Sequence, residues 1–337
     1  MKVWLPTIQV KTGTDTYTMR LAKALRRRGI DAEITWYNKY FELAPFMLRS
    51  VAPPPGTTII HTNSWNGFAF KRRDIPLVTV EHLYVHDALY RPYKTLAQDL
   101  YHQTLVKAYE HATFRMADVI LAVSKFAARK IRDGKFSNKT SVIYNWIDTN
   151  KFTPAPEPHE NKTGPFRLLF LGNLSRRKGA DLLWPIMKQL NTGFELHYTG
   201  DRRLKHERAT NMKHLGHLNE AGVIEECQKC DALLFPSRLE GFGYAALEAM
   251  ACGKPVIATN SSSLPEIVEN NKCGILCKPD DIGEFVTACR TIAGSTDLRN
   301  KMGNAARARA IENFSEETII NQYLRLFERE NHYDRHS

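Results

Sequence analysis

Short apolar runs alternate with longer helical patterns along this chain of 337 residues, and that alternation constrains the fold class more than any other feature. Runs such as 77–80 and 119–123 are apolar at nearly every position, as strands are when both faces of a parallel sheet are covered. The segments between the runs place apolar residues three or four positions apart, which is the spacing of amphipathic helices. The sequence therefore predicts an α/β fold built on parallel sheets.

A proline-rich segment divides this alternation into two series. Pro154, Pro156 and Pro158 can enter neither a strand ladder nor a helix interior, and the sequence stays polar as far as Pro165. Strands are expected at 3–5, 32–37, 58–61, 77–80 and 119–123 before it and at 167–171, 194–198, 232–236 and 255–259 after it. Helices are expected at 17–25, 93–116, 180–190 and 315–330. The sequence therefore predicts two doubly wound domains, with a ligand site at the carboxyl ends of their strands.

Charge is distributed unevenly between the two halves. The chain has 47 Lys and Arg against 36 Asp and Glu, a formal net charge of +11. Residues 1–160 carry 23 basic and 14 acidic side chains, a net +9, and residues 161–337 carry only +2. Such an excess indicates an anionic partner, which can be a nucleic acid, an acidic membrane surface or a charged substrate.

Several classes of protein are excluded at this stage. The longest apolar runs fall far short of the roughly 18 residues that span a bilayer, and the N-terminus has no pattern of a secretory signal. The six cysteines all lie in the second half and are expected to be reduced thiols rather than a disulfide framework. No G-x-G-x-x-G follows a strand, which argues against a dehydrogenase. No recognition helix or aromatic platform accompanies the basic runs, which argues against nucleic acid.

The most informative stretch is 236–255, Pro-Ser-Arg-Leu-Glu-Gly-Phe-Gly-Tyr-Ala-Ala-Leu-Glu-Ala-Met-Ala-Cys-Gly-Lys-Pro. A strand ends at Pro236, and Gly241 and Gly243 flank Phe242 where a helix must begin. Glycine lets the backbone approach a ligand closely, and the amides of a helix N-terminus bind phosphate. A carboxylate in that helix, such as Glu248, can accept hydrogen bonds from two ribose hydroxyls. This stretch therefore predicts a site for a phosphate and a sugar.

These residues resemble a known signature. Two glutamates eight positions apart around Gly-Phe-Gly, followed by Glu-Ala-Met-Ala-x-Gly-x-Pro-Val, are similar to the signature of the retaining glycosyltransferases of family 4. Segments 117–124, 142–154 and 170–179 resemble further motifs of that family, so the likeness covers most of the chain. It implies the GT-B fold, in which two Rossmann-like domains face a cleft. The implied domains are an acceptor domain at 1–163, a nucleotide-sugar domain at 164–312 and a C-terminal helix at 313–337 that crosses back to the first domain.

The resemblance also implies roles for individual residues. Glu240 would bind hydroxyls of the transferred sugar, with His82 placed against the same sugar, and both are the candidate catalytic residues. Glu248 would bind the donor ribose, and Lys178 would neutralise the leaving diphosphate. The other candidate donor-binding residues are Gly13, Asn173, Arg177, Gly241, Phe242, Gly243 and Tyr244. Asn173 stands where the family has an arginine, and Arg176 or Arg177 is expected to replace the lost charge.

The reaction implied is transfer of a sugar from a nucleoside diphosphate sugar with retention, without metal or other cofactor, and with UDP favoured over GDP. Once the domains are assigned, the +9 lies on the half expected to hold the acceptor. That favours a glycan or lipid-linked acceptor of surface polysaccharide or lipopolysaccharide synthesis, and a peripheral enzyme on the cytoplasmic face of an anionic membrane. Two alternatives stay open: a nucleotide-sugar epimerase of the same fold, and an inactive membrane-surface module, which Asn173 favours.

Some of these residues also have ordinary structural interpretations. The alternatives are that His82 only ends a strand, that Lys178 is a surface lysine, and that the basic runs at 26–28 and 71–73 are solvated faces. Cys227 and Cys230 have the spacing of a zinc site, but they fall in a helical pattern before a buried strand, where cysteine acts as a small apolar residue.

Overall fold

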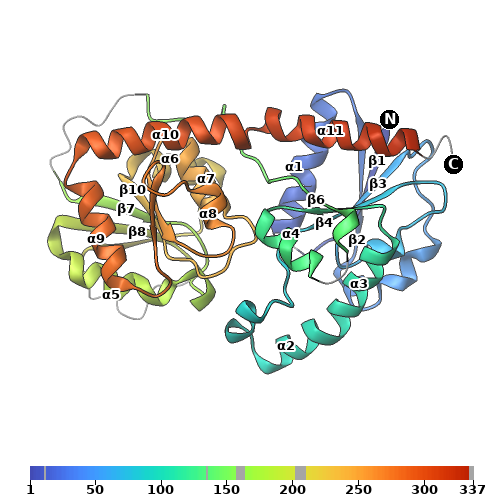
Figure 1. Ribbon diagram of the computed structural model, residues 1–337, viewed down its shortest axis with the longest axis horizontal. Coiled ribbons are helices and arrows are strands. Elements are labelled where there is room, and N and C mark those ends of the chain that lie inside the picture. The colour runs from blue at the N-terminus through green and yellow to red at the C-terminus, as the bar shows by residue number, and fades with distance from the viewer. Residues whose placement is uncertain (11–12, 134–135, 157–163, 202–209, 334–337) are drawn as a thin grey trace. The chain divides into compact units, whose positions relative to one another are not determined.

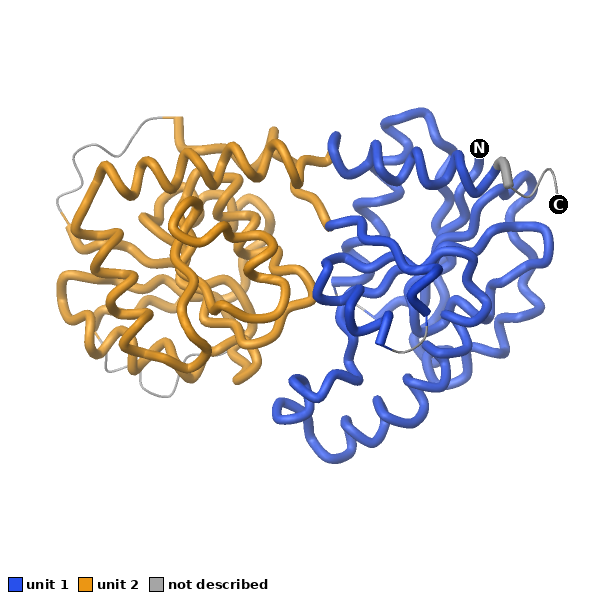
Figure 2. Tube along the Cα trace, viewed as in Figure 1, with its two compact units in different colours: residues 1–144, 317–337 blue, residues 145–316 orange. Residues whose placement is uncertain are grey.

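The computed structural model describes residues 1–10, 13–133, 136–156, 164–201 and 210–333. Two compact units make up the chain (Figures 1 and 2). Unit 1 comprises residues 1–144 and 317–337, and unit 2 comprises residues 145–316. Each unit has one parallel sheet covered by helices, as the alternation of the sequence predicts.

The sheet of unit 1 has six parallel strands in the order β2-β1-β3-β4-β5-β6. The strands are β1 (Lys2–Ile8), β2 (Asp31–Tyr37), β3 (Ile59–Asn63), β4 (Leu77–Glu81), β5 (Val119–Ala122) and β6 (Thr140–Val142). The chain leaves β1 for β2 on one side and later continues with β3 on the other. The strand order therefore reverses between β1 and β3, and such a switch point opens a crevice at the carboxyl ends of the two strands.

Helices cover both faces of this sheet (Figure 1). The helices are α1 (Gly13–Arg27), α2 (Leu96–Tyr101), a π-helical turn (His102–Val106), α3 (Lys107–Met116), α4 (Lys125–Arg132) and α11 (Glu316–Tyr333), with short 3-10 turns at Lys39–Glu42, Pro45–Ser50, Gly67–Ala69, Ala88–Tyr93 and Ser137–Lys139. The helix expected at 93–116 is therefore three consecutive segments that begin at Leu96. α11 is fastened to α1 by a hydrogen bond of 2.5 Å between the buried hydroxyls of Tyr17 and Tyr323.

The sheet of unit 2 also has six parallel strands, in the order β12-β11-β10-β7-β8-β9. The strands are β7 (Phe166–Phe170), β8 (Phe194–Thr199), β9 (Met212–Gly216), β10 (Ala232–Phe235), β11 (Val256–Thr259) and β12 (Gly274–Cys277). The helices are α5 (Ala180–Leu190), α6 (Glu220–Lys229), α7 (Tyr244–Ala251), α8 (Leu264–Ile267), α9 (Ile282–Ala293) and α10 (Thr296–Phe314), with 3-10 turns at Arg176–Lys178 and Asn191–Gly193. The order here reverses between β7 and β10, which gives unit 2 its own switch point.

The units divide at different residues from the boundaries expected at 163/164 and 312/313. Residues 145–156 pack on unit 2, because Arg307 donates hydrogen bonds to the carbonyls of Phe152 (2.6 Å) and Thr149 (2.8 Å). Gln228 donates another to the carbonyl of Thr153, at 2.9 Å. The proline-rich segment thus begins as part of unit 2, and its residues 157–163 lie outside the described residues. Within the described ranges, no helix combines the length and the apolar composition that a membrane span requires.

Candidate active site

The loops after β7 and β10 meet at the switch point of unit 2. β7 and β10 are hydrogen-bonded neighbours, with Ala232 opposite Leu168. Both strands are parallel, so the loops that follow them leave the same edge of the sheet. The loop after β7 carries Asn173 and the 3-10 turn Arg176–Lys178, and the loop after β10 carries Glu240. Two segments about 60 residues apart in sequence are thereby brought together.

Glu240 is the centre of this meeting point. Its carboxylate is buried, and its Oε1 accepts hydrogen bonds from Lys178 Nζ at 2.6 Å and from Ser237 Oγ at 2.5 Å. Arg177 Nη1 lies 3.7 Å from Oε2. Burial by itself would raise the pKa of Glu240, but the charges of Lys178 and Arg177 and these hydrogen bonds lower it below its ordinary value. Glu240 is therefore an ionised carboxylate in a buried site that holds two cations.

Gly179 allows the 3-10 turn Arg176–Lys178, called the Lys178 turn below, to approach the end of β10 closely. Its φ is +72°, and a Cβ on it would lie 2.1 Å from the carbonyl oxygen of Pro236. Only glycine avoids both the left-handed strain and this collision. The residue immediately before it, Lys178, is thus delivered to the end of β10, where Glu240 lies.

Arg238 holds the same two loops together, a role that no motif in the sequence indicates. Its guanidinium donates to both carboxylate oxygens of Asp181, at 2.7 and 2.9 Å, and to Asp280 at 2.5 Å. Its backbone amide donates to the carbonyl of Arg177 at 2.9 Å. The hydrogen bonds that Arg238 donates to Asp181 raise the pKa of this guanidinium above its ordinary value. Its partners lie 42 and 57 residues away, so no local spacing could have revealed them.

The glycine loop leads directly into α7. Gly243 precedes the helix with φ +110°, and a Cβ on it would lie 2.9 Å from Leu264 Cδ2, so the turn requires glycine. Ser263 Oγ donates to the carbonyls of Glu240 (3.1 Å) and Phe242 (2.7 Å), which fixes the loop. No side chain caps the N-terminus of α7, whose amides point toward the carboxyl edge of the sheet. Tyr244 is the first residue of this helix, and the half-buried Glu248 lies one turn later.

Asn173 stands where the family has an arginine, and Arg176 and Arg177 are the two nearby residues expected to supply the missing charge. Asn173 is exposed and accepts a hydrogen bond from Ser175 Oγ at 2.7 Å. Arg177 approaches Glu240 and donates to the carbonyl of Leu239 at 2.6 Å, whereas Arg176 is exposed. Of the two, Arg177 is the one beside the buried carboxylate.

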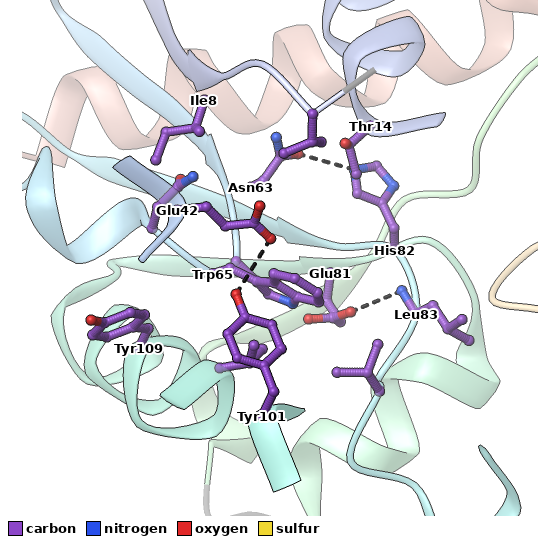
Figure 3. Close-up of a pocket in the computed structure, with 15 residues that line it drawn as sticks. Ile8, Thr14, Glu42, Asn63, Trp65, Glu81, His82, Leu83, Tyr101 and Tyr109 are labelled. Atoms are coloured by element: carbon purple, nitrogen blue, oxygen red, sulfur yellow. Dashed lines mark hydrogen bonds between the residues drawn. The ribbon is translucent and has the colours of Figure 1, made fainter. Parts of the chain in front are cut away.

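His82 and Gly13 belong to the switch point of unit 1. His82 follows β4, and its Nε2 lies 3.2 Å from Asn63 Oδ1 at the end of β3. Burial lowers the pKa of His82 to about 4, so the ring is neutral at pH 7. Gly13 is the first residue of α1, and a Cβ on it would meet open space. His82 also lines a cavity of about 410 Å³ at the carboxyl edge of this sheet (Figure 3).

A buried acidic pair lies next to that cavity. Glu81, at the end of β4, lines it, and Glu110 of α3 is completely buried with His86 Nε2 at 3.0 Å. His86 is thus part of a buried cluster rather than an ordinary loop residue. Burial is the main cause that raises the pKa of both carboxyls, that of Glu110 to about 7, and Glu110 also raises that of Glu81. The pair therefore retains protons well above the usual range.

This pair predicts a pH dependence of stability. Through Glu110 the folded chain holds a proton that the unfolded chain has released between the ordinary carboxyl pKa, about 4.5, and about 7. The contribution of this group to the free energy of unfolding therefore falls as the pH rises through that interval, while the lowered pKa values of the buried His61, His82 and His86 act in the opposite sense. We expect Glu110→Gln to remove this fall and to stabilise unit 1 at pH 7.5 by about 1–3 kcal/mol. Urea unfolding at pH 5 and 7.5 measures it, and an unchanged difference between the two pH values in the variant would contradict it.

The cysteines occupy core positions. All six are buried and free, and Cys227 and Cys230 lie at the end of α6, where the Cys230 thiol donates to the carbonyl of Cys227 at 3.2 Å. Among the described residues, His, Cys, Asp and Glu form no group of three or more that could hold a metal ion.

Comparison with known proteins gives the family. A family model for group 1 glycosyl transferases matches residues 152–309, and a model for glycosyltransferase family 4 matches residues 36–151. Together the two cover most of the chain. The chain belongs to the family 4 glycosyltransferases. The resemblance drawn from residues 236–255 is thereby confirmed.

Individual relatives agree with the family. The chain is 28% identical to the glycogen synthase of Mycobacterium tuberculosis over 236 residues, 66% of this chain and 56% of that protein. It is 27% identical to a GDP-mannose-dependent monoacylated alpha-(1-6)-phosphatidylinositol monomannoside mannosyltransferase of Corynebacterium glutamicum over 240 residues, 63% of this chain and 62% of that one. The matches thus span little more than half the length of these curated relatives.

Solved structures confirm the GT-B fold. HepE of Anabaena in complex with UDP and glucose aligns over 97% of this chain and 99% of its own, with a TM-score of 0.74 and 21% identity. The lipopolysaccharide outer core galactosyltransferase WaaB aligns over 98% of this chain and 100% of its own, with a TM-score of 0.69 and 18% identity. At these identities the likeness concerns the fold alone.

Proposed function

We propose that this chain transfers a sugar from a nucleoside diphosphate sugar to a hydroxyl group of a glycan or lipid-linked acceptor, with retention of the anomeric configuration. The observation that carries the proposal is the ion pair of Lys178 with the buried carboxylate of Glu240 beside the glycine loop of α7. A leaving diphosphate needs fixed cations and N–H donors, and a sugar ring needs a fixed hydrogen-bond acceptor. Unit 2 supplies all three at its switch point.

Each candidate residue takes a role that its surroundings allow. Lys178 and Arg177 stabilise the charge that develops on the diphosphate, which makes a metal ion unnecessary. The amides of Gly241, Phe242 and Gly243 approach the phosphates, and Tyr244 begins the helix whose N-terminus faces them. Glu248 accepts hydrogen bonds from the ribose, and Glu240 from hydroxyls of the transferred sugar. Asn173 retains a donor-binding role only as a hydrogen-bonding group, and Gly13 leaves room for the donor phosphate.

The bond changes follow from these roles. The glycosidic bond to the diphosphate breaks, and the acceptor oxygen bonds to the same face of the anomeric carbon. The departing phosphate oxygen takes the proton of the acceptor hydroxyl, so that no protein nucleophile or separate base is required. We assign His82, whose ring is neutral, to the transferred sugar on the strength of the family resemblance.

We favour UDP over GDP as the nucleotide. The HepE structure contains UDP and glucose, which supports UDP, while the mannosyltransferase relative is named as GDP-mannose-dependent. WaaB supports an acceptor of the lipopolysaccharide or surface polysaccharide type. The relatives named above are synthases and transferases, which favours transfer over the epimerase alternative.

Incubation with radiolabelled UDP-sugars and GDP-sugars, with and without glycan and lipid-linked acceptors, tests the proposed transfer. We expect product only when an acceptor is present, and conversion of the donor without acceptor would contradict the proposal.

Glu248→Gln tests the ribose contact. The substitution preserves size but removes the charge of the acceptor group, so we expect UDP to bind about tenfold more weakly, since a hydrogen bond to a charged group contributes about 1.5 kcal/mol. Titration calorimetry with UDP gives the Kd. Glu225→Gln, on the exposed face of α6, is the matched control and should bind UDP as the wild type does. Equal affinity in Glu248→Gln would remove this residue from the site.

We further propose peripheral attachment to an anionic membrane at its cytoplasmic face. The first 160 residues carry a net charge of +9, and apolar side chains are exposed on two segments of unit 1. These are Leu96 (92% exposed) and Leu100 of α2, and Phe46 and Met47 of the 3-10 turn Pro45–Ser50. The hydroxyl of Tyr109 in α3 donates to the carbonyl of Leu43 at 2.8 Å, which ties α3 to the residue that ends the turn Lys39–Glu42.

Vesicle binding tests the attachment. Exposed leucines next to basic charge insert into the headgroup region of anionic lipid. We expect co-sedimentation with vesicles containing phosphatidylglycerol, loss of binding at high salt, and about tenfold weaker binding of the double variant Leu96→Gln, Leu100→Gln. The double variant Met19→Gln, Ile311→Gln, which changes exposed apolar residues elsewhere, is the control. Equal binding to neutral phosphatidylcholine vesicles would contradict the proposal.

A further inference from the structure

The cavity of unit 1 lies where a parallel sheet places its ligands. Its lining comes from the segments that follow β1, β3 and β4, including Thr14, Asn66 and His82, and from α2 and α3. Because the strand order reverses between β1 and β3, this is the switch point of the sheet. Its volume of about 410 Å³ lies within the range of about 300–1,000 Å³ that is typical of sites for small molecules.

Three aromatic side chains line the cavity together with aliphatic ones such as Ile8 and Val106. Trp65 enters from the segment after β3, Tyr101 from α2 and Tyr109 from α3 (Figure 3). The face of a pyranose ring that carries axial C–H groups is apolar and packs on an aromatic ring, while its hydroxyls point outward in the ring plane. Large rigid aromatic side chains with a polar end therefore suit a sugar.

Side-chain oxygens that can accept hydrogen bonds also line the cavity. Asn66 Oδ1 is buried and has no hydrogen-bond partner among the described residues. The carboxylate of Glu42 points at Tyr101, whose hydroxyl lies 3.5 Å from Oε1, at the outer limit of a hydrogen bond (Figure 3). Glu81 closes the floor, with Oε1 accepting from the amide of Leu83 at 2.8 Å. A buried unpartnered oxygen has a cost that the hydroxyl of a ligand would remove.

The described part of the lining offers a phosphate no cation. Of the described residues that line the cavity, none is Lys or Arg, and two are glutamates. Burial raises the pKa of Glu42 and of Glu81, as expected where negative charge is poorly solvated. A phosphate here would be desolvated without a compensating cation.

We propose that this cavity binds an uncharged sugar ring of the acceptor, packed on Trp65 with its hydroxyls donating to Asn66 and Glu42, and that it excludes phosphate. The proposal rests on the glycosyl transfer proposed above and adds the chemical class of the acceptor group. A lipid-linked or phosphorylated acceptor then presents a neutral sugar to the cavity, and its phosphate lies outside.

Saturation-transfer NMR on the full chain with saturating UDP tests the inference. The probes are methyl glycosides of neutral hexoses, deoxyhexoses and N-acetylhexosamines, together with hexose 1-phosphates and 6-phosphates. We expect at least one neutral glycoside to bind, its signal to be unaffected by an excess of the phosphates, and Trp65→Ala to weaken it about fivefold or more. Trp36→Ala, an exposed tryptophan outside the cavity, is the matched control.

The outcomes separate this inference from the proposed function. If UDP itself does not bind, the proposed function fails. If UDP binds but no neutral glycoside does, or if the sugar phosphates compete equally well, the cavity assignment is wrong and the proposed function stands. Should Trp65→Ala fail to fold, Trp65→Phe and Asn66→Ala replace it: the first should retain binding and the second should weaken it, and the reverse order would overturn the proposal.

Discussion

Lys178→Ala is expected to reduce turnover by about a hundredfold to a thousandfold, the loss seen when one group that stabilises a developing negative charge is removed. Its Nζ lies 2.6 Å from Glu240 Oε1, so among the described residues the same change leaves that buried carboxylate with Arg177, at 3.7 Å, as its remaining cation. We therefore also expect unit 2 to lose about 3 kcal/mol of stability. Initial rates of sugar transfer and urea unfolding measure the two effects.

Two comparisons make this result interpretable. Lys188→Ala removes an exposed lysine from α5 in the same unit and should leave both quantities unchanged. Lys178→Ala combined with Glu240→Gln should recover much of the stability but none of the turnover, because the buried charge is gone while the diphosphate still lacks its cation. Turnover within twofold of the wild type in Lys178→Ala would remove this lysine from the donor site.

Gly179→Ala is expected to have the larger effect on folding. A Cβ at this position lies 2.1 Å from the carbonyl oxygen of Pro236, and φ is +72°, so either the Lys178 turn or the end of β10 must move. Such a conflict between two backbone segments destabilises by several kcal/mol, on the order of 3–5. Donor affinity should fall with it, since Lys178 and Glu240 are placed by these two segments. Thermal unfolding and UDP titration measure both.

Gly193→Ala is the matched control for this substitution. Gly193 belongs to the same unit, its φ is not positive, and a Cβ on it would meet nothing within 4 Å. Its melting temperature should therefore stay close to that of the wild type. If Gly179→Ala melts like Gly193→Ala, the close approach of the turn to Pro236 does not exist in solution.

The sequence predicted the regular elements well where a local pattern specified them. The strand runs at 77–80 and 119–123 and the helix at 180–190 correspond to β4, β5 and α5. Errors arose where distant contacts decide the structure. The proline composition placed the division between the domains at 153–165, whereas the units divide at 144/145 because Arg307, more than 150 residues away, donates to the carbonyls of Thr149 and Phe152 and holds residues 145–156 on unit 2. The helix α10 was missed, because its buried residues include alanines and a glycine rather than a clear apolar stripe.

For the candidate site too, local motifs were predicted from the sequence and contacts between distant segments were not. Glycines around Phe242 and the glutamates at 240 and 248 mark a phosphate and sugar site by local chemistry, and the family models confirm the family that this motif resembles. The pairing of Lys178 with Glu240 was not predicted, because it depends on β7 and β10 being neighbours in the sheet. The clamp formed by Arg238 with Asp181 and Asp280 and the aromatic cavity around Trp65 depend likewise on segments that meet only in the folded chain.

Calorimetric titration of the wild-type chain with UDP and with GDP tests the central claim most directly, because it needs neither the acceptor nor the transferred sugar to be known. The account predicts that one equivalent of at least one of these nucleotides, UDP in the first place, binds with a Kd in the micromolar range. It also predicts that Lys178→Ala binds the same nucleotide more weakly. Absence of binding by both nucleotides at millimolar concentration to a folded wild-type chain would contradict the account.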